Sequence, residues 1–588
     1  KNEQFIDTVK QIKTHLNKEI SIDIEYVIPI KNIPKTTSGK VQRYKLTKDY
    51  LEGKFLKAIQ TLEFLENVGR SDKLPSSETE KKVLAIWNKV LEVSHEGIGN
   101  NFFEIGGNSI KASLFSSKAT SEFEVIVTIR DLFKNPTVEL ISKLIDSKSR
   151  SAIELIPIVS ERNNYPTSTA QKRLFLLHLL NPESLNYNIT SIHEIEKEID
   201  LEKVESIFKI LIKKHSILRT NIKEIGGEPV QVINNEILFN VDKINAQKDF
   251  LDDEIKAYIK PYNLTNDRLF KVGYFKTETS QFLVFDIHHI IADGYSLNLL
   301  VSEFSDLYNS KELVSKSVRF VDFSSWEPDF LASEEIKRQE KFWLNEFLGE
   351  IPILNFPSDY PRTLKKNDIA KTWNDRIDSS LYQLMWMHAK KNELTFYMQL
   401  LSAFCIVLQK YTDNEDVIVG TPIMNRPHNG ISSVLGPFIN TVPLRNKPIG
   451  AKSIGAFITE VKENLINAFS NQNYPFELLV DKVNVERDLD RNPMFDILFV
   501  LQNTNNADLN LGENKVKPYP FTSGHTKFDF NIQLTEKNEG FDIRFEYASE
   551  IYKEETISQF VGHFKDVLQQ ICQLDRDKKI DDISIVPF

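Results

Sequence analysis

The spacing of apolar residues changes partway along the chain, and this change limits the fold more than any other feature. Between residues 77 and 146 the apolar positions recur every three to four residues, which predicts amphipathic helices. From residue 153 onward, apolar strand-like runs such as 281–290 and 495–502 alternate with helical stretches such as 201–214. The chain is therefore expected to hold a small helical domain before a much larger α/β region.

The length of 588 residues also predicts several domains, because single cores rarely grow past about 250–300 residues. The expected parts are residues 1–50, a linker over 51–76, a helical bundle over 77–146, a linker over 147–160, and an α/β region over 161–588 with two lobes, about 161–335 and 336–588. The first 50 residues bury too little surface to form a domain alone. We expect them to be the tail of a larger domain or to pack on the next segment.

Composition excludes several classes of protein. Hydrophobic residues make up 41% and charged residues 27%, which is ordinary globular usage. The net charge is −10 without a dense basic block, so we expect no nucleic-acid partner. Two cysteines, Cys405 and Cys572, cannot form a disulfide framework, and no stretch approaches 18 apolar residues. These features predict a cytoplasmic protein with no membrane segment, and we expect it to be a monomer.

The region over 77–146 predicts a four-helix bundle. Its first helix opens with a capping box at Ser77 and Glu80 and carries one apolar stripe. A second helix is expected to begin near Ser109, and the stop at Asn135-Pro136 separates a short third helix from a fourth.

The run FFEIGGNSI at 102–110 presents one serine, Ser109, after a Gly-Gly turn. Gly106 and Gly107 allow positive φ and a close backbone approach. Ser109 then lies at a helix N-terminus, where free N–H groups and the helix dipole favour a phosphate ester. Most serines at this position are only N-caps, so the residues alone leave both roles open.

The run HHIIADG at 288–294 comes after the apolar strand FLVFDI, so His288 and His289 should emerge where a strand ends. A buried histidine pair can be structural. A metal site is not expected, because no third ligand stands at a recognisable spacing. A histidine with a pKa near neutrality suits proton handling when an amine attacks a thioester.

Two residues just after the histidines are interpreted as structural. Asp293 supplies a carboxylate that would pair with an arginine, and Arg219 and Arg426 are both candidates. Gly294 is expected to form a tight turn.

The serine motif lies in a longer resemblance. NFFEIGGNSIKA, with a capped helix before it and LFKNPTVELI after it, resembles the carrier domains of nonribosomal peptide synthetases. The resemblance implies that Ser109 bears 4′-phosphopantetheine, attached by a separate phosphopantetheinyl transferase. Gly107 would help to form the cofactor site.

The histidine motif is one of a series that resembles nonribosomal peptide synthetase condensation domains over 160–585. The series comprises YPTSTAQKRLFLL, KKHSILRT, HHIIADG, FVDFSSW, GTPIMNRP, VLGPFINTVPLR and RDLDRNPMFDILFVLQN. It implies an α/β fold of two lobes like chloramphenicol acetyltransferase, with an active-site tunnel between them. His289 would be catalytic and His288, Asp293 and Gly294 would hold its geometry. Arg219, Arg426 and Asn440 would support the site.

Some residues depart from the condensation-domain pattern. Phe175, Phe320 and Phe323 stand where tyrosine or tryptophan is frequent, and NRP replaces the more usual AGR in GTPIMNRP. These changes would alter the tunnel lining without touching the histidines.

The N-terminal run PKTTSGKVQR at 34–43 resembles the closing motif of adenylate-forming enzymes. In that family the lysine, here Lys40, contacts the acyl-adenylate. This makes residues 1–50 a short α+β remnant of such a domain. SGKVQR is closer to fatty-acyl ligases than to amino-acid-activating enzymes, which hints at a fatty-acyl donor and a starter N-acylation.

The resemblance predicts amide-bond formation between an acyl, aminoacyl or peptidyl thioester on Ser109 and the amine of an aminoacyl group on a downstream carrier. An upstream remainder of the adenylating domain is a further expected partner. Three alternatives stay open: an epimerisation domain, an inactive docking platform for carriers, and a coenzyme-A-dependent acyltransferase.

Overall fold

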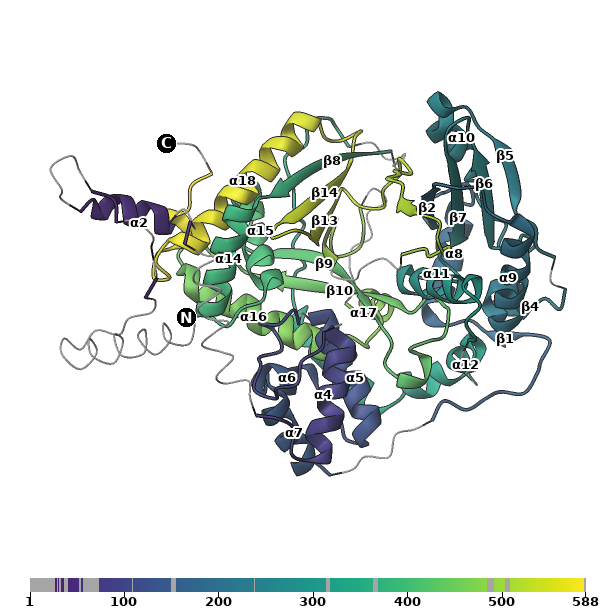
Figure 1. Ribbon diagram of the computed structural model, residues 1–588, viewed down its shortest axis with the longest axis horizontal. Coiled ribbons are helices and arrows are strands. Elements are labelled where there is room, and N and C mark those ends of the chain that lie inside the picture. Colours follow the sequence, from purple (N-terminus) through teal and green to yellow (C-terminus); the bar gives the residue numbers. More distant parts are fainter. Residues whose placement is uncertain are drawn as a thin grey trace.

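The computed structural model describes residues 27–28, 30, 33–35, 41–51, 54–55, 73–91, 93–107, 109–149, 155–236, 238–313, 318–362, 369–483, 491–502 and 508–585 (Figure 1). Lys40 and most of the predicted linker over 51–76 lie outside these residues, so the adenylate-forming remnant stays a prediction. Helix α2 (Arg43–Leu51) comes after a turn in which the Gln42 amide donates to the Pro34 carbonyl at 2.8 Å.

The helical bundle contains the four predicted helices. They are α4 (Glu78–Leu91), α5 (Ser109–Phe123), α6 (Ile129–Lys134) and α7 (Val138–Ser147). Its core is built around Trp87, whose ring lies 4.7 Å from that of Phe102 and 5.5 Å from that of Phe115, centroid to centroid. Phe102 precedes the Gly-Gly turn, so the core of the bundle also anchors the loop before Ser109.

The first lobe is a sheet covered by helices. Its five-stranded sheet has the order β12 (Val516–Pro518), β2 (Asn188–Ile195), β7 (Gln281–His288), β6 (Phe270–Lys276), β5 (Asp242–Asn245), and a smaller sheet has the order β1 (Tyr165–Pro166), β4 (Glu228–Ile233), β3 (Thr220–Ile225). The helices are α8 (Thr169–Leu180), α9 (Leu201–Lys214), α10 (Leu251–Tyr258), α11 (Gly294–Tyr308) and α12 (Phe320–Leu331), with short η1 (Ser216–Arg219) and η2 (Lys248–Phe250). β7 is buried on both faces from Phe282 to His288, as its continuous apolar run predicts.

The second lobe has a mixed sheet and its own helices. The strand order is β10 (Ile439–Asn446), β9 (Val417–Met424), β11 (Ile497–Gln502), β13 (Phe530–Glu536), β14 (Phe541–Ala548), β8 (Ala370–Ile377). The helices are α13 (Glu334–Glu346), α14 (Ser379–Lys391), α15 (Phe396–Thr412), α16 (Ile454–Ser470), α17 (Phe476–Lys482) and α18 (Glu554–Gln573), with short η3 (Asn429–Ile431) and η4 (Ile580–Asp582). α15 is buried continuously from Tyr397 to Gln409, and this burial includes the thiol-bearing Cys405.

A segment from the second half of the sequence crosses into the first lobe, over the boundary between the lobes that we call the seam. β12 lies in the second half of the sequence but pairs antiparallel with β2, so that Val516 faces Ile195. Leu509 and Leu511, just before it, are buried in the core of the first lobe. A single division near residue 335 therefore does not describe the lobes, because these apolar side chains find their burial on the other side.

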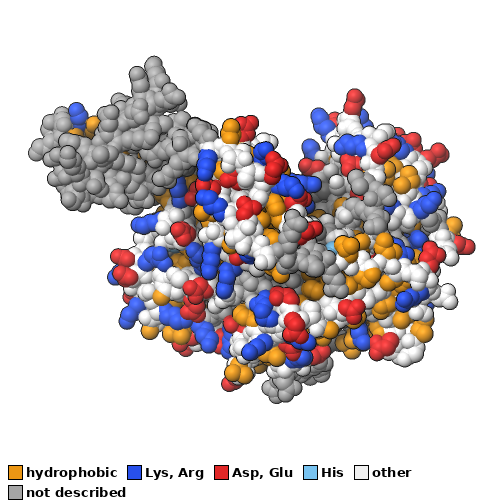
Figure 2. Space-filling view, turned by 90° about the horizontal axis from the view of Figure 1, so that it is seen from below, with side chains coloured by type: hydrophobic (Ala, Val, Ile, Leu, Met, Phe, Trp, Pro, Cys, Tyr) orange, Lys and Arg blue, Asp and Glu red, His pale blue; other side chains and the backbone are white. Residues whose placement is uncertain are grey.

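Charged side chains of both signs share the surface. On the face seen in Figure 2, Lys and Arg side chains are interspersed with Asp and Glu, and they form no continuous basic stripe among the described residues. In the same described part of the chain, no helix is long and apolar enough to cross a membrane.

Candidate functional site

The turn before Ser109 is held by its two glycines in different ways. Gly106 has a φ of +100°, a conformation that favours glycine. A Cβ on Gly107 would lie 2.2 Å from a ring carbon of Phe102 and 2.3 Å from its carbonyl oxygen. The Gly107 amide donates to that carbonyl at 2.8 Å. Gly107 has no positive φ, so that part of the expectation is wrong, and its close approach is made to Phe102. Its role in the cofactor site stays a prediction.

Helix α5 begins at Ser109, where the motif predicts a helix N-terminus. The first N–H groups of a helix have no acceptor within the helix, and the dipole places partial positive charge there. This environment fits a phosphodiester on the first residue of α5. The residues at this end of the bundle therefore suit a phosphopantetheine group.

The paired histidines stand at the end of β7, as predicted. His288 is the last residue of the strand and faces Asn188 of β2 in the sheet register. The backbone amide of His289 continues this pairing by donating to the Tyr187 carbonyl at 2.7 Å. The His288 ring is fixed separately, since its Nδ1 accepts the Ile290 amide at 3.1 Å.

Both imidazoles are held in the neutral form. Burial lowers the pKa of His288 to about 3, and nearby positive charges act in the same direction. Burial also lowers the pKa of His289 to about 4, and the positive charge of Lys527 adds to this. Asp293 and nearby backbone carbonyls favour the charged His289 ring but do not offset these effects. A neutral His289 can accept a proton at physiological pH.

The two nitrogens of His289 differ in their surroundings. Nδ1 is buried and makes no well-formed hydrogen bond with the described residues. His289 as a whole is only half-buried. Nε2 is therefore the nitrogen that can meet a reactant.

Asp293 connects the histidine loop to the second lobe. It caps α11, because its Oδ1 accepts the Ser296 amide at 2.7 Å, and its Oδ2 accepts the Phe438 amide at 3.0 Å. Nη2 of Arg426 lies 3.6 Å from its Oδ1. Asp293 thus joins the two lobes through both of its carboxylate oxygens.

Of the two arginines that could pair with Asp293, only one lies near it among the described residues. Arg426 is the one that approaches Asp293, and it also donates to the carbonyls of Ile431 and Val434 at 2.5 and 2.7 Å. Arg219 instead donates to the Asn234 carbonyl at 2.6 Å, so of the two candidates it is Arg426 that pairs with Asp293.

The turn predicted at Gly294 is also wrong. Gly294 is the first residue of α11, has no positive φ, and a Cβ there would meet no atom within 4 Å. The chain reverses earlier, where the Ile291 amide donates to the His288 carbonyl at 3.1 Å. The Asp293 cap then starts the helix directly.

Asn440 supports the loop that precedes α17. Its Nδ2 donates to the carbonyls of Gln472 and Tyr474, each at 2.9 Å, and its Oδ1 accepts the Phe476 amide at 3.0 Å. This residue therefore fixes the loop over 472–476 through three bonds, although it lies in β10.

The same loop contacts the helical bundle. Nε2 of Gln472 donates to Oγ of Ser113, one turn after Ser109 in α5, at 2.8 Å. Arg130 of α6 donates to Asn467 of α16. Figure 1 shows the bundle beside α16, at the lower edge of the second lobe. The first turns of the serine helix thus face the loop that Asn440 holds.

Three charged residues near the histidines were not anticipated from the sequence. Arg173 of α8 forms an ion pair with Glu477 of α17 across the seam at 2.7 Å. Nζ of Lys527, just before β13, lies 4.0 Å from the centre of the Tyr187 ring. In the sequence, Lys527 stands just before the alternating run FDFNIQL, which suggests only a charge near the end of a strand. This weak signal does not indicate that the lysine lies near the histidines.

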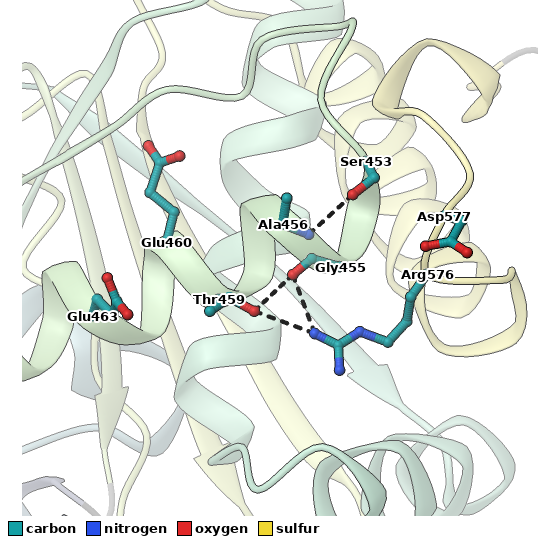
Figure 3. Close-up of a pocket in the computed structure, with 8 residues that line it drawn as sticks. All are labelled: Ser453, Gly455, Ala456, Thr459, Glu460, Glu463, Arg576 and Asp577. Carbon is teal, nitrogen blue, oxygen red and sulfur yellow. Dashed lines mark hydrogen bonds between the residues drawn. The ribbon is translucent and has the colours of Figure 1, made fainter.

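A surface hollow at the start of α16 lies apart from these groups (Figure 3). Its lining residues are Ser453, Gly455, Ala456, Thr459, Glu460, Glu463, Arg576 and Asp577. Arg576 donates to the Gly455 carbonyl and to Thr459 Oγ1, each at 3.2 Å. These bonds tie α16 to the segment after α18, which indicates a structural role.

Comparison with known protein families covers most of the chain. A family model described as a condensation domain matches residues 161–587, and one described as a phosphopantetheine attachment site matches residues 81–145. Bacitracin synthase 3 of Bacillus licheniformis is 35% identical over 97% of this chain. Gramicidin S synthase 2 of Brevibacillus brevis is 36% identical over 95% of it. The chain spans only 9% and 12% of the length of these two relatives.

Solved structures share the fold of the larger region. The X-domain from teicoplanin biosynthesis matches 74% of this chain and 100% of its own, with a TM-score of 0.68 and 19% identity. A four-domain nonribosomal peptide synthetase bound to AMP and glycine matches 74% of this chain and 35% of its own, with a TM-score of 0.66 and 19% identity. These likenesses confirm the predicted two-lobed α/β fold.

Proposed function

The chain belongs to the condensation-domain family of nonribosomal peptide synthetases and carries a phosphopantetheine attachment domain, and from this premise we propose a specific reaction for it. The carrier presents an acyl, aminoacyl or peptidyl thioester attached through Ser109. The condensation domain joins that carbonyl to the amine of an aminoacyl group held by a downstream carrier. The product is an amide on the downstream carrier.

One observation supports the chain's own carrier as the donor. The bond between Ser113 and Gln472 holds the start of α5 against the loop over 472–476. α17 begins at the end of this loop, and its Glu477 pairs with Arg173 of the first lobe. The attachment helix therefore abuts a segment that reaches the seam where His289 lies.

The residues of the site have different roles in the proposed reaction. When attached, phosphopantetheine supplies the thiol that carries the acyl group as an activated thioester. Because the thioester is already activated, the site mainly has to bring two reactants together and exclude water. His289 Nε2 accepts the proton of the attacking amine, which neutral imidazole can do. Asp293 and His288 keep the loop that carries this ring in place.

The partners belong to the same proposal. The amine comes from an aminoacyl group on a downstream carrier, and a phosphopantetheinyl transferase modifies Ser109 beforehand. An upstream adenylating domain loads the donor. The chain is proposed to work as a monomer, since the donor carrier and the condensation domain lie in one polypeptide and no second copy is needed to bring them together.

The test uses the 588-residue chain with a defined donor and acceptor. A phosphopantetheinyl transferase and an aminoacyl-coenzyme A load the carrier, and an aminoacyl thioester of N-acetylcysteamine serves as acceptor. We expect loss of the aminoacyl mass from the protein and a dipeptidyl thioester in solution. Loading without any amide product, under conditions where the chain is folded, would contradict the proposal.

Two further arms separate the other functions. A loaded chain kept in D₂O without acceptor would gain deuterium at the α-carbon if the domain epimerised its cargo, and we expect no gain. A fatty-acyl-coenzyme A used as donor tests the starter reaction. Faster amide formation with this donor than with an aminoacyl donor would assign the chain to N-acylation.

A further inference from the structure

Lys527 comes from the second lobe but lies against residues of the first. It stands between β12 and β13, and its Nζ lies 4.0 Å from the centre of the Tyr187 ring. The carbonyl of Tyr187 accepts the His289 amide at 2.7 Å. Two contacts thus connect the ammonium group to the backbone of the proposed catalytic histidine.

The backbone of Lys527 is anchored on its own side of the seam. Its carbonyl accepts Nδ2 of Asn492 at 2.9 Å. The adjacent Thr526 is buried, and its hydroxyl donates to the Phe528 carbonyl at 3.1 Å. The segment over 526–528 is therefore held in place, and it positions Lys527 at the seam.

Charged groups face this cluster from several packed elements. Lys527 faces Arg173 from α8 and Glu546 from β14, and His289 faces Lys527, His288 and Asp293, which itself faces Arg426. Burial, and then Arg173, lower the pKa of Lys527 to about 7. The lysine is thus charged throughout the pH range in which His289, with a pKa of about 4, would take up a proton.

We propose that Lys527 is a positioning residue for amide formation, whose positive charge across the seam prevents His289 from retaining a proton. In the step, the amine nitrogen forms the C–N bond and gives its proton to Nε2 of His289. The C–S bond breaks, and the same proton passes from Nε2 to the departing sulfur. An imidazolium beside an ammonium group is a stronger acid, so the second transfer is favoured.

Histidine-ring NMR of the 588-residue chain tests this without any turnover. The chain carries ¹³C-labelled histidine, and His289→Gln assigns the resonance. In Lys527→Met we expect the titration midpoint of His289 to move to higher pH, because a neighbouring positive charge is gone. Lys527→Arg keeps a permanent charge and should leave the midpoint where it is in the unaltered chain.

A matched lysine provides the control. Nζ of Lys203 lies 4.1 Å from the centre of the Tyr308 ring, a similar cation–aromatic contact on α9. Lys203→Met should leave the His289 midpoint unchanged. An unchanged midpoint in folded Lys527→Met, or an equal shift in Lys203→Met, would overturn the proposal.

The unaltered chain gives a second measurement if Lys527→Met fails to fold. Its His289 resonance should show a small additional inflection near pH 7, where Lys527 loses its charge. A flat trace there would count against the proposal. The proton transfers from the amine to the departing sulfur rest on the proposed function, whereas the titration of His289 does not. Failure of amide formation and failure of this inference are therefore distinguishable. In the amide assay Lys527→Met should lower the rate below pH 7, where Lys527 is charged, and the difference from the unaltered chain should shrink at higher pH.

Discussion

The carrier and the condensation domain prepare their functional residues in opposite ways. In the carrier, one short stretch from Phe102 to Ser109 contains the anchor, the turn and the start of the helix. In the condensation domain, His289 depends on Tyr187, Asp293 and Lys527, and Asp293 in turn depends on Phe438 and Arg426. Changes in the carrier should therefore act locally, whereas changes near His289 should depend on how the lobes meet.

The difference also concerns solvent. In the carrier, Ser109 is the first residue of α5, at one end of the small bundle. In the condensation domain His288 is buried and His289 is partly buried, and burial is the largest cause of their low pKa values. Burial around the imidazoles helps to exclude water, which tethered acyl transfer requires of this region.

The largest expected effect is all-or-none. Ser109→Ala removes the hydroxyl that would carry the prosthetic group, so the chain should gain no mass from coenzyme A and a phosphopantetheinyl transferase. Intact-protein mass spectrometry measures the result. Ser113→Ala, one turn away on α5, is the control and should be modified fully. A mass gain in Ser109→Ala would show that another residue is modified.

The next effect should fall on amide formation alone. His289→Ala should lower the rate by about 100-fold or more, because a general base contributes about that much, while modification of Ser109 stays complete. His193→Ala is the control, since His193 is also a buried histidine of the first lobe and bonds Ser191 at 2.9 Å. Near-normal product from folded His289→Ala would remove this histidine from the mechanism.

Gly107→Ala should damage the carrier and spare the condensation domain. The new methyl group would overlap Phe102, and overpacking of this kind costs about 1–3 kcal/mol. Thermal unfolding should show an early transition of the carrier, with the main transition unchanged. Gly562→Ala, where a Cβ meets nothing within 4 Å, is the matched control. A single unshifted transition in Gly107→Ala would mean that the turn and the Phe102 ring accommodate the methyl group without loss of stability.

Asp293→Asn should weaken the contact between the lobes without removing the helix cap. The amide oxygen can still accept the Ser296 amide, but the nitrogen that replaces Oδ2 cannot accept the Phe438 amide, and the charge that attracts Arg426 is lost. We expect the rate of amide formation to fall by roughly 10- to 100-fold, since a hydrogen bond to a charged group contributes about 1.5–3 kcal/mol. Arg219→Gln should have no such effect, because Arg219 bonds elsewhere. Equal losses in both variants would argue against Arg426 as the partner.

The smallest effect concerns delivery by the fused carrier. Gln472→Ala removes the bond to Ser113, and one hydrogen bond contributes about 1 kcal/mol, or roughly fivefold. Transfer from the chain's own loaded carrier should slow by about this factor. Transfer from a soluble acyl thioester should not change, because it needs no docking. A loss with both donors would place Gln472 in the site itself.

Local features of the fold were predictable from the sequence. Helix α9 matches the predicted 201–214, β7 ends at His288, and α5 starts at Ser109. Each of these depends on apolar spacing, caps and turns within about ten residues of chain. The local structure around Ser109 was accordingly predictable almost completely.

Contacts between distant segments were not predictable in this way. No local pattern separates Arg219 from Arg426, because both are single arginines and only the fold brings one of them to Asp293. Lys527 and Glu477 reach the seam through the packing of β13 and α17. Such pairings depend on tertiary geometry, which periodicity does not encode.

The strand exchange by β12 has a mechanical consequence. Val516, Lys517 and Pro518 lie in register with β2, and the Tyr519 amide donates to the Ile192 carbonyl at 2.9 Å. Backbone hydrogen bonds thereby join the two lobes at the β12 edge of the first-lobe sheet. Such bonds resist separation of the lobes at this edge, and the bond from the Phe438 amide to Asp293 and the ion pair between Arg173 and Glu477 add further connections across the boundary.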